Sequence, residues 1–384
     1  MAFVLVIVVM LSLLAGATYY LSHRFYGGLV AFFPTVKFWP VLLVFSVLTL
    51  LLILGFAHSM LPLPKAVNHI IGIIGNYCMG IVLYLLVFTL ITDLVFIIPR
   101  LLKLAFITHR LFKGFVAIGV IVATLVTSVY GFVNARQIDH VSYKINLQGK
   151  KDISDLNIVM ISDLHLGSVG SEGRLESIVT EINSLKPDIV CIAGDFFDTD
   201  FGAINDPDAA LKTLLKLDST YGTYACLGNH DAGETSAKMT DFLSKANIKL
   251  LSEEYTVIDN RLVLIGRLDS APIGKYDGVA RKKVSDFFEV TDPSMPVIVM
   301  DHNPANIDEY NGDIDLILSG HTHKGQLFPA NLVTKMIYTV DYGHYQKDSN
   351  SPHVIVSSGV GYWGMPMRVG SDCEIVSIQV FSNS

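Results

Sequence analysis

The sequence has 384 residues, of which 51% are hydrophobic and only 16% are charged, with a net charge of −7 at pH 7. Its mean hydropathy of +0.48 is too high for an ordinary soluble protein. Residues 1–133 hold seven of the 28 Lys and Arg and one of the 35 acids, so residues 134–384 hold 21 basic and 34 acidic groups. This acidic part argues against nucleic-acid binding, which needs clustered Lys and Arg.

Four apolar stretches precede the acidic part, and each approaches or exceeds the ~20 residues that span a bilayer as a helix. They cover residues 2–21, 38–57, 70–98 and 115–133. We therefore predict a transmembrane domain of four helices over residues 1–133. Its sole acid, Asp93, lies within the third stretch, where a carboxylate is costly and is a candidate functional group. Pairing with the nearby Arg100 is the plainer interpretation.

The loops between these stretches predict the orientation of the chain in the membrane. Loops 22–37 and 99–114 contain six Lys and Arg between them, whereas loop 58–69 contains one. The positive-inside rule places the two basic loops in the cytoplasm. With four spans, both termini then lie outside, and we expect the C-terminal part to be an extracytoplasmic domain of a multi-pass cell-membrane protein.

From residue 134 the pattern changes to apolar strands that alternate with amphipathic helices, which is typical of an α/β domain. We expect a linker and first strand over 134–154 and the main domain over 155–384. Strands are predicted at 157–161, 188–193, 223–227, 262–267, 296–300, 314–319, 353–358 and 374–381. Helices are predicted at 175–185, 207–217 and 235–246.

Five polar motifs follow the ends of predicted strands. In chain order they are D-x-H at 163–165, G-D-x-x-D at 194–198, G-N-H-D at 228–231, a lone His302, and G-H-T-H at 320–323. Open α/β sheets gather ligands at the carboxyl ends of their strands, so these side chains are expected to converge. A mixed set of carboxylate, imidazole and amide groups suits Mn, Fe or Zn better than Ca²⁺.

The five motifs, in this order, resemble those of the calcineurin-like metallophosphoesterase superfamily, and the resemblance covers essentially all of residues 155–380. The extended G-H-T-H-x-G-Q and the run S-S-G-x-G-x-W-G-x-P-x-R, which ends at Arg368, look most like its bacterial membrane-anchored branch. That branch is related to UDP-diacylglucosamine hydrolases and other lipid-linked phosphoesterases. The resemblance implies a four-layer α-β-β-α fold, with two central mixed sheets flanked by helices.

The resemblance also implies a role for each motif residue. Seven side chains would bind two divalent metal ions: Asp163, His165 and His323 the first, Asn229, His302 and His321 the second, and Asp195 both. A hydroxide that bridges the ions would attack phosphorus. His230 would stabilise the phosphoryl group or protonate the leaving oxygen, and Asp198 would hydrogen-bond and orient His230.

Four further residues are candidates for substrate contact. Asn303 follows the lone histidine, and Gln326 follows the last metal motif. Trp363 lies in the glycine-rich run, where it could line the site, face the bilayer or pack in the core. Arg368 could bind a substrate phosphate, with a surface salt bridge as the alternative.

Four spans exceed what anchoring requires, so we expect membrane lipids as partners and a lipid-linked phosphoester or pyrophosphate as substrate. One alternative is a broad ectophosphodiesterase that acts on soluble nucleotides and uses the spans only as an anchor. Another is a non-catalytic receptor or scaffold on a degenerate hydrolase fold. That last alternative predicts a missing metal ligand, and all seven are present.

Overall fold

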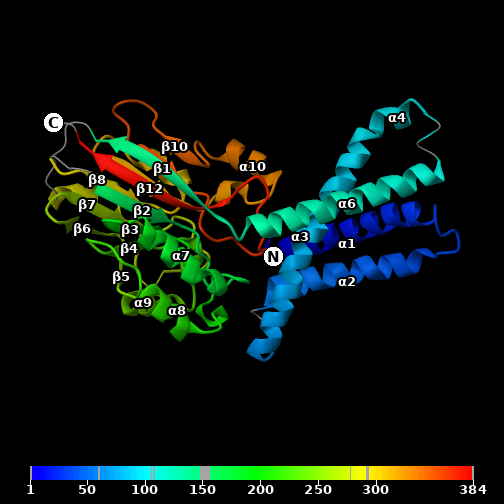
Figure 1. Ribbon diagram of the computed structural model, residues 1–384, viewed down its shortest axis with the longest axis horizontal. Coiled ribbons are helices and arrows are strands. Elements are labelled where there is room, and N and C mark those ends of the chain that lie inside the picture. Colours follow the sequence, from blue (N-terminus) through cyan, green and yellow to red (C-terminus); the bar gives the residue numbers. More distant parts are fainter. Residues whose placement is uncertain are drawn as a thin grey trace. The chain divides into compact units, whose positions relative to one another are not determined.

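The computed structural model describes residues 2–58, 61–104, 106, 109–147, 156–276, 278–290 and 294–382. The chain divides into two compact units, Met1–Phe132 and Val133–Ser384. Figure 1 labels the elements of both. The first unit is helical, and the second contains two β-sheets with the helices that pack on them.

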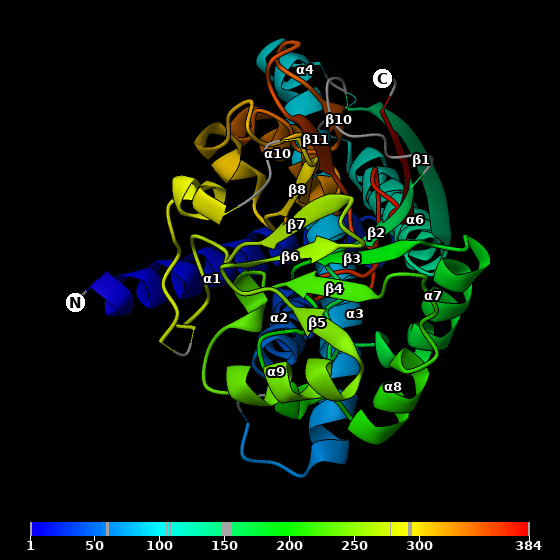
Figure 2. The ribbon, with the colours of Figure 1, turned by 90° about the vertical axis from the view of Figure 1, so that its left-hand side faces the viewer.

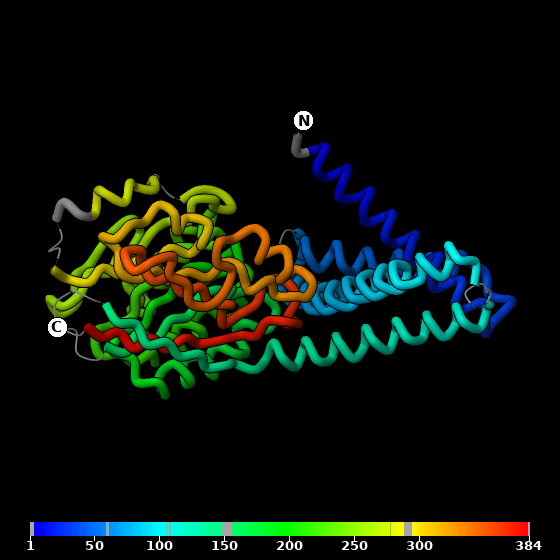
Figure 3. The backbone as a smooth tube through the Cα atoms, turned by 90° about the horizontal axis from the view of Figure 1, so that it is seen from above, coloured from blue at the N-terminus to red at the C-terminus, as the bar shows by residue number. Residues whose placement is uncertain are grey.

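The first unit consists mainly of long apolar helices. They are α1 (Ala2–Leu29), α2 (Phe38–Ala57), α3 (Lys65–Val95) and α6 (Arg110–Asn134), with the short α4 (Ile97–Leu101) after α3. Within the described ranges, four helices are long and apolar enough to cross a membrane, and Figure 3 traces them from the blue N-terminal end. The four predicted spans are thereby confirmed as helices of this kind, although α1 and α6 are longer than predicted.

Asp93 is a paired group. Its carboxylate accepts a hydrogen bond of 2.6 Å from the Tyr20 hydroxyl and one of 2.8 Å from the Arg100 guanidinium, and it also pairs with Arg24. These contacts tie α1 to the end of α3 and to α4. Since two guanidinium groups compensate the charge, the plainer interpretation of Asp93 is the one that agrees with the structure.

The second unit is built on two six-stranded mixed sheets. The first sheet has the order β1 (Ile138–Asn146), β12 (Cys373–Phe381), β2 (Leu156–Ile161), β3 (Ile189–Ala193), β4 (Thr223–Cys226) and β5 (Ile248–Leu250). The second has the order β10 (Gly343–Tyr345), β11 (His353–Val356), β9 (Leu316–Ser319), β8 (Val297–Met300), β7 (Leu262–Gly266) and β6 (Glu254–Ile258). Strands β2 to β5 are mutually parallel, as are β7, β8, β9 and β11, so their carboxyl ends share one edge of each sheet.

Apolar side chains fill three spaces around these sheets. Met160 of the first sheet and Ile298 of the second belong to one buried cluster between the sheets. Helices α7 (Glu172–Ser184), α8 (Pro207–Leu214) and α9 (Ser236–Lys245) contribute to a cluster with the first sheet (Figure 2). Phe287 and Ile307, from short 3-10 helices, pack on the second sheet. The four-layer prediction is confirmed, with short helical turns on the outer side of the second sheet.

The sequence pattern missed the short elements. Strands β5 and β10 have three residues each, and β6 and helix α10 (Ala330–Ile337) were not predicted. Three residues are too few to establish an alternating pattern. Helix α10 was missed for another reason, because it contributes no buried residue and therefore no inward-facing apolar stripe.

Candidate dinuclear metal centre

The seven predicted metal ligands lie together at the carboxyl ends of strands from both sheets. In the first sheet β2 is followed by Asp163 and His165, β3 by Asp195 and β4 by Asn229; in the second, β8 is followed by His302 and β9 by His321 and His323. All are buried except His321, which is partly exposed. The site therefore forms where the parallel edges of the two sheets meet.

The backbone at five of these residues is left-handed. The φ angles are +54° at Asp163, +48° at His165, +51° at Asp195, +71° at His321 and +49° at His323. This conformation is uncommon outside glycine and costs of order 1–3 kcal/mol per residue. It lets the chain turn sharply as it leaves a strand, so that side chains from different strands point to a common centre.

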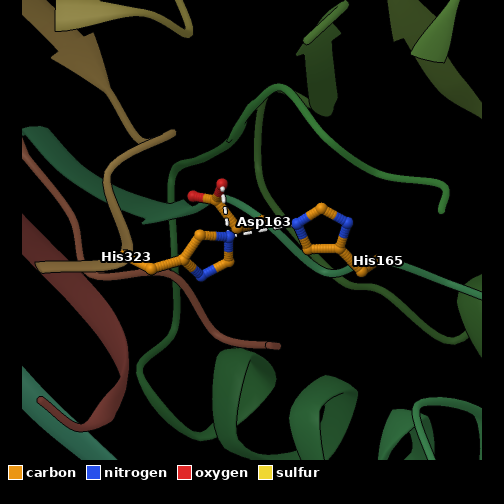
Figure 4. A group of neighbouring side chains, drawn as sticks. All are labelled: Asp163, His165 and His323. Carbon is orange, nitrogen blue, oxygen red and sulfur yellow. Dashed lines mark hydrogen bonds and ion pairs between the residues drawn. The ribbon is translucent and has the colours of Figure 1, made fainter. Parts of the chain in front are cut away.

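The first group of ligands consists of Asp163, His165 and His323 (Figure 4). The Nε2 atoms of the two histidines are 3.1 Å apart, and His323 Nε2 lies 3.4 Å from Asp163 Oδ1. Each residue offers one ligand atom, and the three atoms lie within 4.8 Å of one another. Two imidazole nitrogens and a carboxylate oxygen thus face one point, as in sites for divalent transition metals.

The second group consists of Asp195, His302 and His321. His302 Nε2 lies 3.1 Å from Asp195 Oδ2, and His321 Nδ1 lies 2.8 Å from the side-chain oxygen of Asn229. Asp195 also reaches the first group, because its Oδ2 is 3.8 Å from His165 Nε2. Asp163 Oδ1 lies 4.0 Å from His302 Nε2, so both carboxylates approach the other group. Asp195 makes the shorter of these cross-group contacts and is the better placed of the two for a bridging ligand.

These donors fit divalent cations, because the protein leaves some of their lone pairs unused. His302 Nδ1 lies 2.8 Å from the Ala193 carbonyl oxygen, which fixes the proton on Nδ1 and leaves a lone pair on Nε2. Among the described residues, that buried Nε2 has no hydrogen-bond partner. Asp163 and Asp195 add two negative charges that are almost completely shielded from solvent. Buried carboxylates of this kind are costly unless cations compensate them.

The electrostatics of Asp195 and His302 show the same need for compensation. Burial raises the pKa of the Asp195 carboxyl, but the positive charge of His302 outweighs burial and holds the pKa well below its usual range. Burial lowers the pKa of His302, but the carboxylates of Asp195 and Asp163 raise it well above its ordinary value. A second proton on His302 Nε2 thus compensates Asp195, and a divalent ion bound at that nitrogen would take the place of this proton.

The surroundings of His230 differ from the prediction. Its Nδ1 lies 2.6 Å from the Thr199 hydroxyl oxygen, whereas Asp198 Oδ1 is 3.9 Å away. Asp198 Oδ1 is nearer to Nδ1 of the ligand His165, at 3.5 Å. The hydrogen-bond partner that orients His230 is therefore Thr199, and Asp198 lies beside His165. Burial lowers the pKa of His230 below its usual value, which favours the neutral ring.

The motifs did not indicate Thr199 or the role of Asp231. Thr199 has a φ of +64°, which is rare for a β-branched residue and cannot be read from the sequence. The Asp231 carboxylate accepts hydrogen bonds from the backbone N–H groups of Phe196, Phe197 and Gly228, and so joins two metal-binding loops. Burial, reinforced by the charge of Asp195, raises the pKa of Asp231 to about 7.

Three of the four predicted substrate contacts lie near the site or its rim. The Trp363 ring centroid is 6.1 Å from that of His230, and the side chain is 43% exposed. Gln326 holds this loop in place, because its side-chain oxygen accepts from Trp363 N at 2.9 Å and its amide donates to Trp363 O at 2.9 Å. Asn303 is buried, and its side-chain oxygen accepts from Ala305 N. Trp363 alone of these three presents an exposed surface to a substrate.

Arg368 has a different role from the predicted one. Its side chain is completely buried, and its guanidinium donates to the carbonyl oxygens of His323 at 3.0 Å and Ser358 at 2.7 Å. It also lies 3.2 Å from His323 Nδ1. In this position it cannot reach a substrate phosphate or the surface. It instead fixes the backbone and ring of a metal ligand.

The calcineurin-like phosphoesterase family profile matches residues 156–325, the segment that carries all five motifs. A protein of Aquifex aeolicus (strain VF5), described as an uncharacterized metallophosphoesterase, is 34% identical over 242 residues. The match covers 62% of this chain and 90% of that protein. The chain belongs to the calcineurin-like metallophosphoesterase family.

Two further relatives extend this result. An uncharacterized metallophosphoesterase of Helicobacter pylori (strain ATCC 700392 / 26695) is 33% identical over 234 residues, 59% of this chain, and the match spans about three fifths of that relative's length. A Danio rerio protein, described as a transmembrane protein with metallophosphoesterase domain, is 28% identical over 353 residues. That match covers 85% of this chain and 78% of the relative. This share exceeds what Val133–Ser384 can supply, so the likeness continues into the helical unit.

The close approach of Gly228 to Asp195 yields a test. A Cβ atom at Gly228 would lie 2.2 Å from Asp195 Oδ1. We expect Gly228→Ala to displace the shared carboxylate, to reduce the bound metal and to lower phosphoester hydrolysis at least ~100-fold, since a misplacement of about 1 Å costs that much. Elemental analysis and steady-state kinetics would measure both effects. Gly173→Ala is the control, because no atom lies within 4 Å of a Cβ there. Full metal content and activity in Gly228→Ala would contradict the assigned bridging role.

Proposed function

We propose that this protein is a membrane-anchored, dinuclear metal-dependent phosphoesterase that hydrolyses a lipid-linked phosphoester or pyrophosphate at the extracytoplasmic membrane surface. The observation that carries the proposal is two of the three candidate ligand groups in the described part of the chain, Asp163 with His165 and His323, and Asp195 with His302 and His321. The third group, His165 with Asp195 and His230, overlaps both. Asp195 reaches both groups. Family membership supports the reaction class.

When bound, two divalent ions supply an activated water as nucleophile and stabilise the charge that develops on phosphorus. The protein's own residues then complete the site. If the Thr199 hydroxyl donates to Nδ1 of His230, the ring proton is on Nε2, the nitrogen left to a substrate oxygen. With the ring neutral, His230 is thereby set to donate a hydrogen bond from Nε2 to a phosphoryl or leaving oxygen. Its backbone N–H donates to Asp195 Oδ1 at 2.8 Å, which fixes the ring beside the shared ligand.

Two observations support a substrate in the membrane. Retention at a membrane needs one span, and this chain has four helices capable of crossing. A relative described as transmembrane resembles the chain beyond the hydrolase unit. Both are expected if the helices take part in handling a lipid. The orientation rests on loop charge, with six Lys and Arg in loops 22–37 and 99–114 against one in loop 58–69.

The metal centre and His230 are separable by substitution. We expect Asp195→Ala to lose bound metal and all hydrolysis, whereas His230→Ala should keep its metal and lose ~10²–10³ in rate, the usual cost of removing one hydrogen-bond donor to the transition state. Thr199→Val keeps the shape of the side chain but removes the hydroxyl. This variant should also keep the metal, and its hydrolysis rate should lie between those of His230→Ala and wild type. Elemental analysis and kinetics on one soluble diester would measure this. Equal metal loss in all three variants, or unchanged activity in His230→Ala, would refute the assignment.

Substrate class is tested with the full chain in lipid nanodiscs. We expect kcat/KM for a phosphoester on an acyl or polyprenyl chain to exceed that for soluble nucleotides by about tenfold or more, because anchored enzyme and substrate share a two-dimensional pool and apolar contacts add binding energy. A mass-detected panel of lipid phosphoesters and nucleotides would give the comparison. Activity on nucleotides with none on any lipid tried would favour a broad ectophosphodiesterase.

Orientation is tested by labelling introduced cysteines. Leu215 lies on the hydrolase unit, and Lys113 lies in the first turn of α6, within the predicted loop 99–114. Both are exposed, and the four native cysteines are buried. We expect a membrane-impermeant maleimide to label Leu215→Cys in intact spheroplasts and to label Lys113→Cys only after lysis. The reverse pattern would place the metal centre in the cytoplasm.

A further inference from the structure

Helix α10 exposes its apolar side to the surroundings. Leu332, Val333, Met336 and Ile337 are 51%, 53%, 86% and 68% exposed, and Phe328, just before the helix, is 43% exposed. We call these five residues the apolar face of α10. A contiguous exposed patch of large apolar side chains marks an interaction surface, whereas single exposed hydrophobic residues do not.

The polarity of α10 is inverted relative to that of an ordinary surface helix. At about 100° per residue, its four exposed apolar side chains occupy one arc of roughly 140°. The opposite arc carries Asn331, Thr334 and Tyr338, which are partly buried against the domain. The Thr334 hydroxyl donates to the Asp341 carboxylate at 2.8 Å. A surface helix in water directs its apolar side inward, so the outward apolar side of α10 requires an apolar partner.

The apolar face lies near the point where the chain leaves its last apolar helix. Asn134, the final residue of α6, donates from its side-chain amide to Ser371 O at 3.1 Å and to Asp372 Oδ1 at 3.0 Å. In the same loop, Val369 O accepts from Phe328 N at 2.7 Å. All these residues belong to the unit Val133–Ser384. If α6 crosses the bilayer, this loop and the start of α10 are held at the membrane surface.

The same segment adjoins the metal centre. Tyr338, which directly follows α10, has its ring centroid 6.2 Å from that of the ligand His321. On the preceding side, Gln326 is hydrogen-bonded to the backbone of Trp363, whose ring lies beside that of His230. The residue that follows the apolar face of α10 therefore contacts a candidate metal ligand, and a residue just before that face holds the loop of Trp363.

We propose that the apolar face of α10 inserts into the acyl-chain boundary of the leaflet in which α6 ends, and that a lipid-linked ester passes from that leaflet to the metal centre along this face. If α6 crosses the bilayer, the tether at Asn134 brings that bilayer close to the start of α10, so the bilayer is the occupant proposed. Lys335, the one charged residue of α10, lies at the edge of the apolar arc and matches anionic head groups. The insertion is inferred from the exposed apolar face of α10 and from the hydrogen bonds of Asn134 to residues 371 and 372. The substrate path rests on the proposed function.

Insertion is measured with the full chain in nanodiscs of phosphatidylethanolamine and phosphatidylglycerol. Met336→Cys and Leu215→Cys, each labelled with an environment-sensitive nitrobenzoxadiazole dye, are compared for quenching by lipids with doxyl groups on their acyl chains. Leu215 is the matched control, because it is exposed and apolar but lies at the end of α8. We expect quenching at 336 to exceed that at 215 about threefold or more. This readout needs no turnover, so it fails independently of the proposed function.

Equal quenching at the two positions would overturn the insertion. Absence of quenching at 336 together with oxidative cross-linking between Met336→Cys chains would overturn it in favour of a second copy as the occupant.

For the substrate path, we expect the double variant Leu332→Glu and Met336→Glu to lower kcat/KM on a membrane-embedded phosphoester about tenfold or more. In the same double variant, hydrolysis of soluble bis(p-nitrophenyl) phosphate should stay within about twofold of wild type. The control variant Leu215→Glu should leave the kinetics on both substrates unchanged. Equal loss on both substrates, or on neither, would overturn the path.

Discussion

Two buried carboxylates, Asp163 and Asp195, organise the functional edge of this protein. They follow the adjacent parallel strands β2 and β3, and each accepts backbone hydrogen bonds from a later motif. Asp163 accepts from His321 N at 3.1 Å, and Asp195 from His230 N at 2.8 Å. The negative charge of a carboxylate that is shielded from water must be compensated by other groups. Imidazole and amide groups that follow strands of both sheets therefore lie around these two side chains. The left-handed backbone at five ligands and the close packing of Gly228 on Asp195 follow from that demand.

The sequence predicted the parts of the structure that repeat a strong local pattern. Long apolar stretches specified the helices of the first unit, and apolar strands that end in Asp, Asn or His specified the metal centre. It failed where tertiary contacts decide the outcome. Arg368 sits in a glycine-rich run that resembles a loop, yet its guanidinium is buried against His323. Thr199 displaces Asp198 as the partner of His230 through a backbone turn that no local pattern encodes.

The proposed insertion of α10 would join the chemistry of the site to the membrane. The segment from Gln326 to Tyr338 runs from the support of Trp363, through an exposed apolar helix, to a ring contact with His321. The loop that pairs with its start is tied to Asn134, the end of the last apolar helix.

The central claim is that the seven ligands hold two ions with Asp195 between them, and anomalous scattering from the manganese-loaded protein tests it most directly. The account predicts two peaks about 3.5–4 Å apart, one beside Asp163, His165 and His323 and the other beside Asn229, His302 and His321. Asp195 should contact both peaks. A single peak, or peaks outside these residues, would contradict the account.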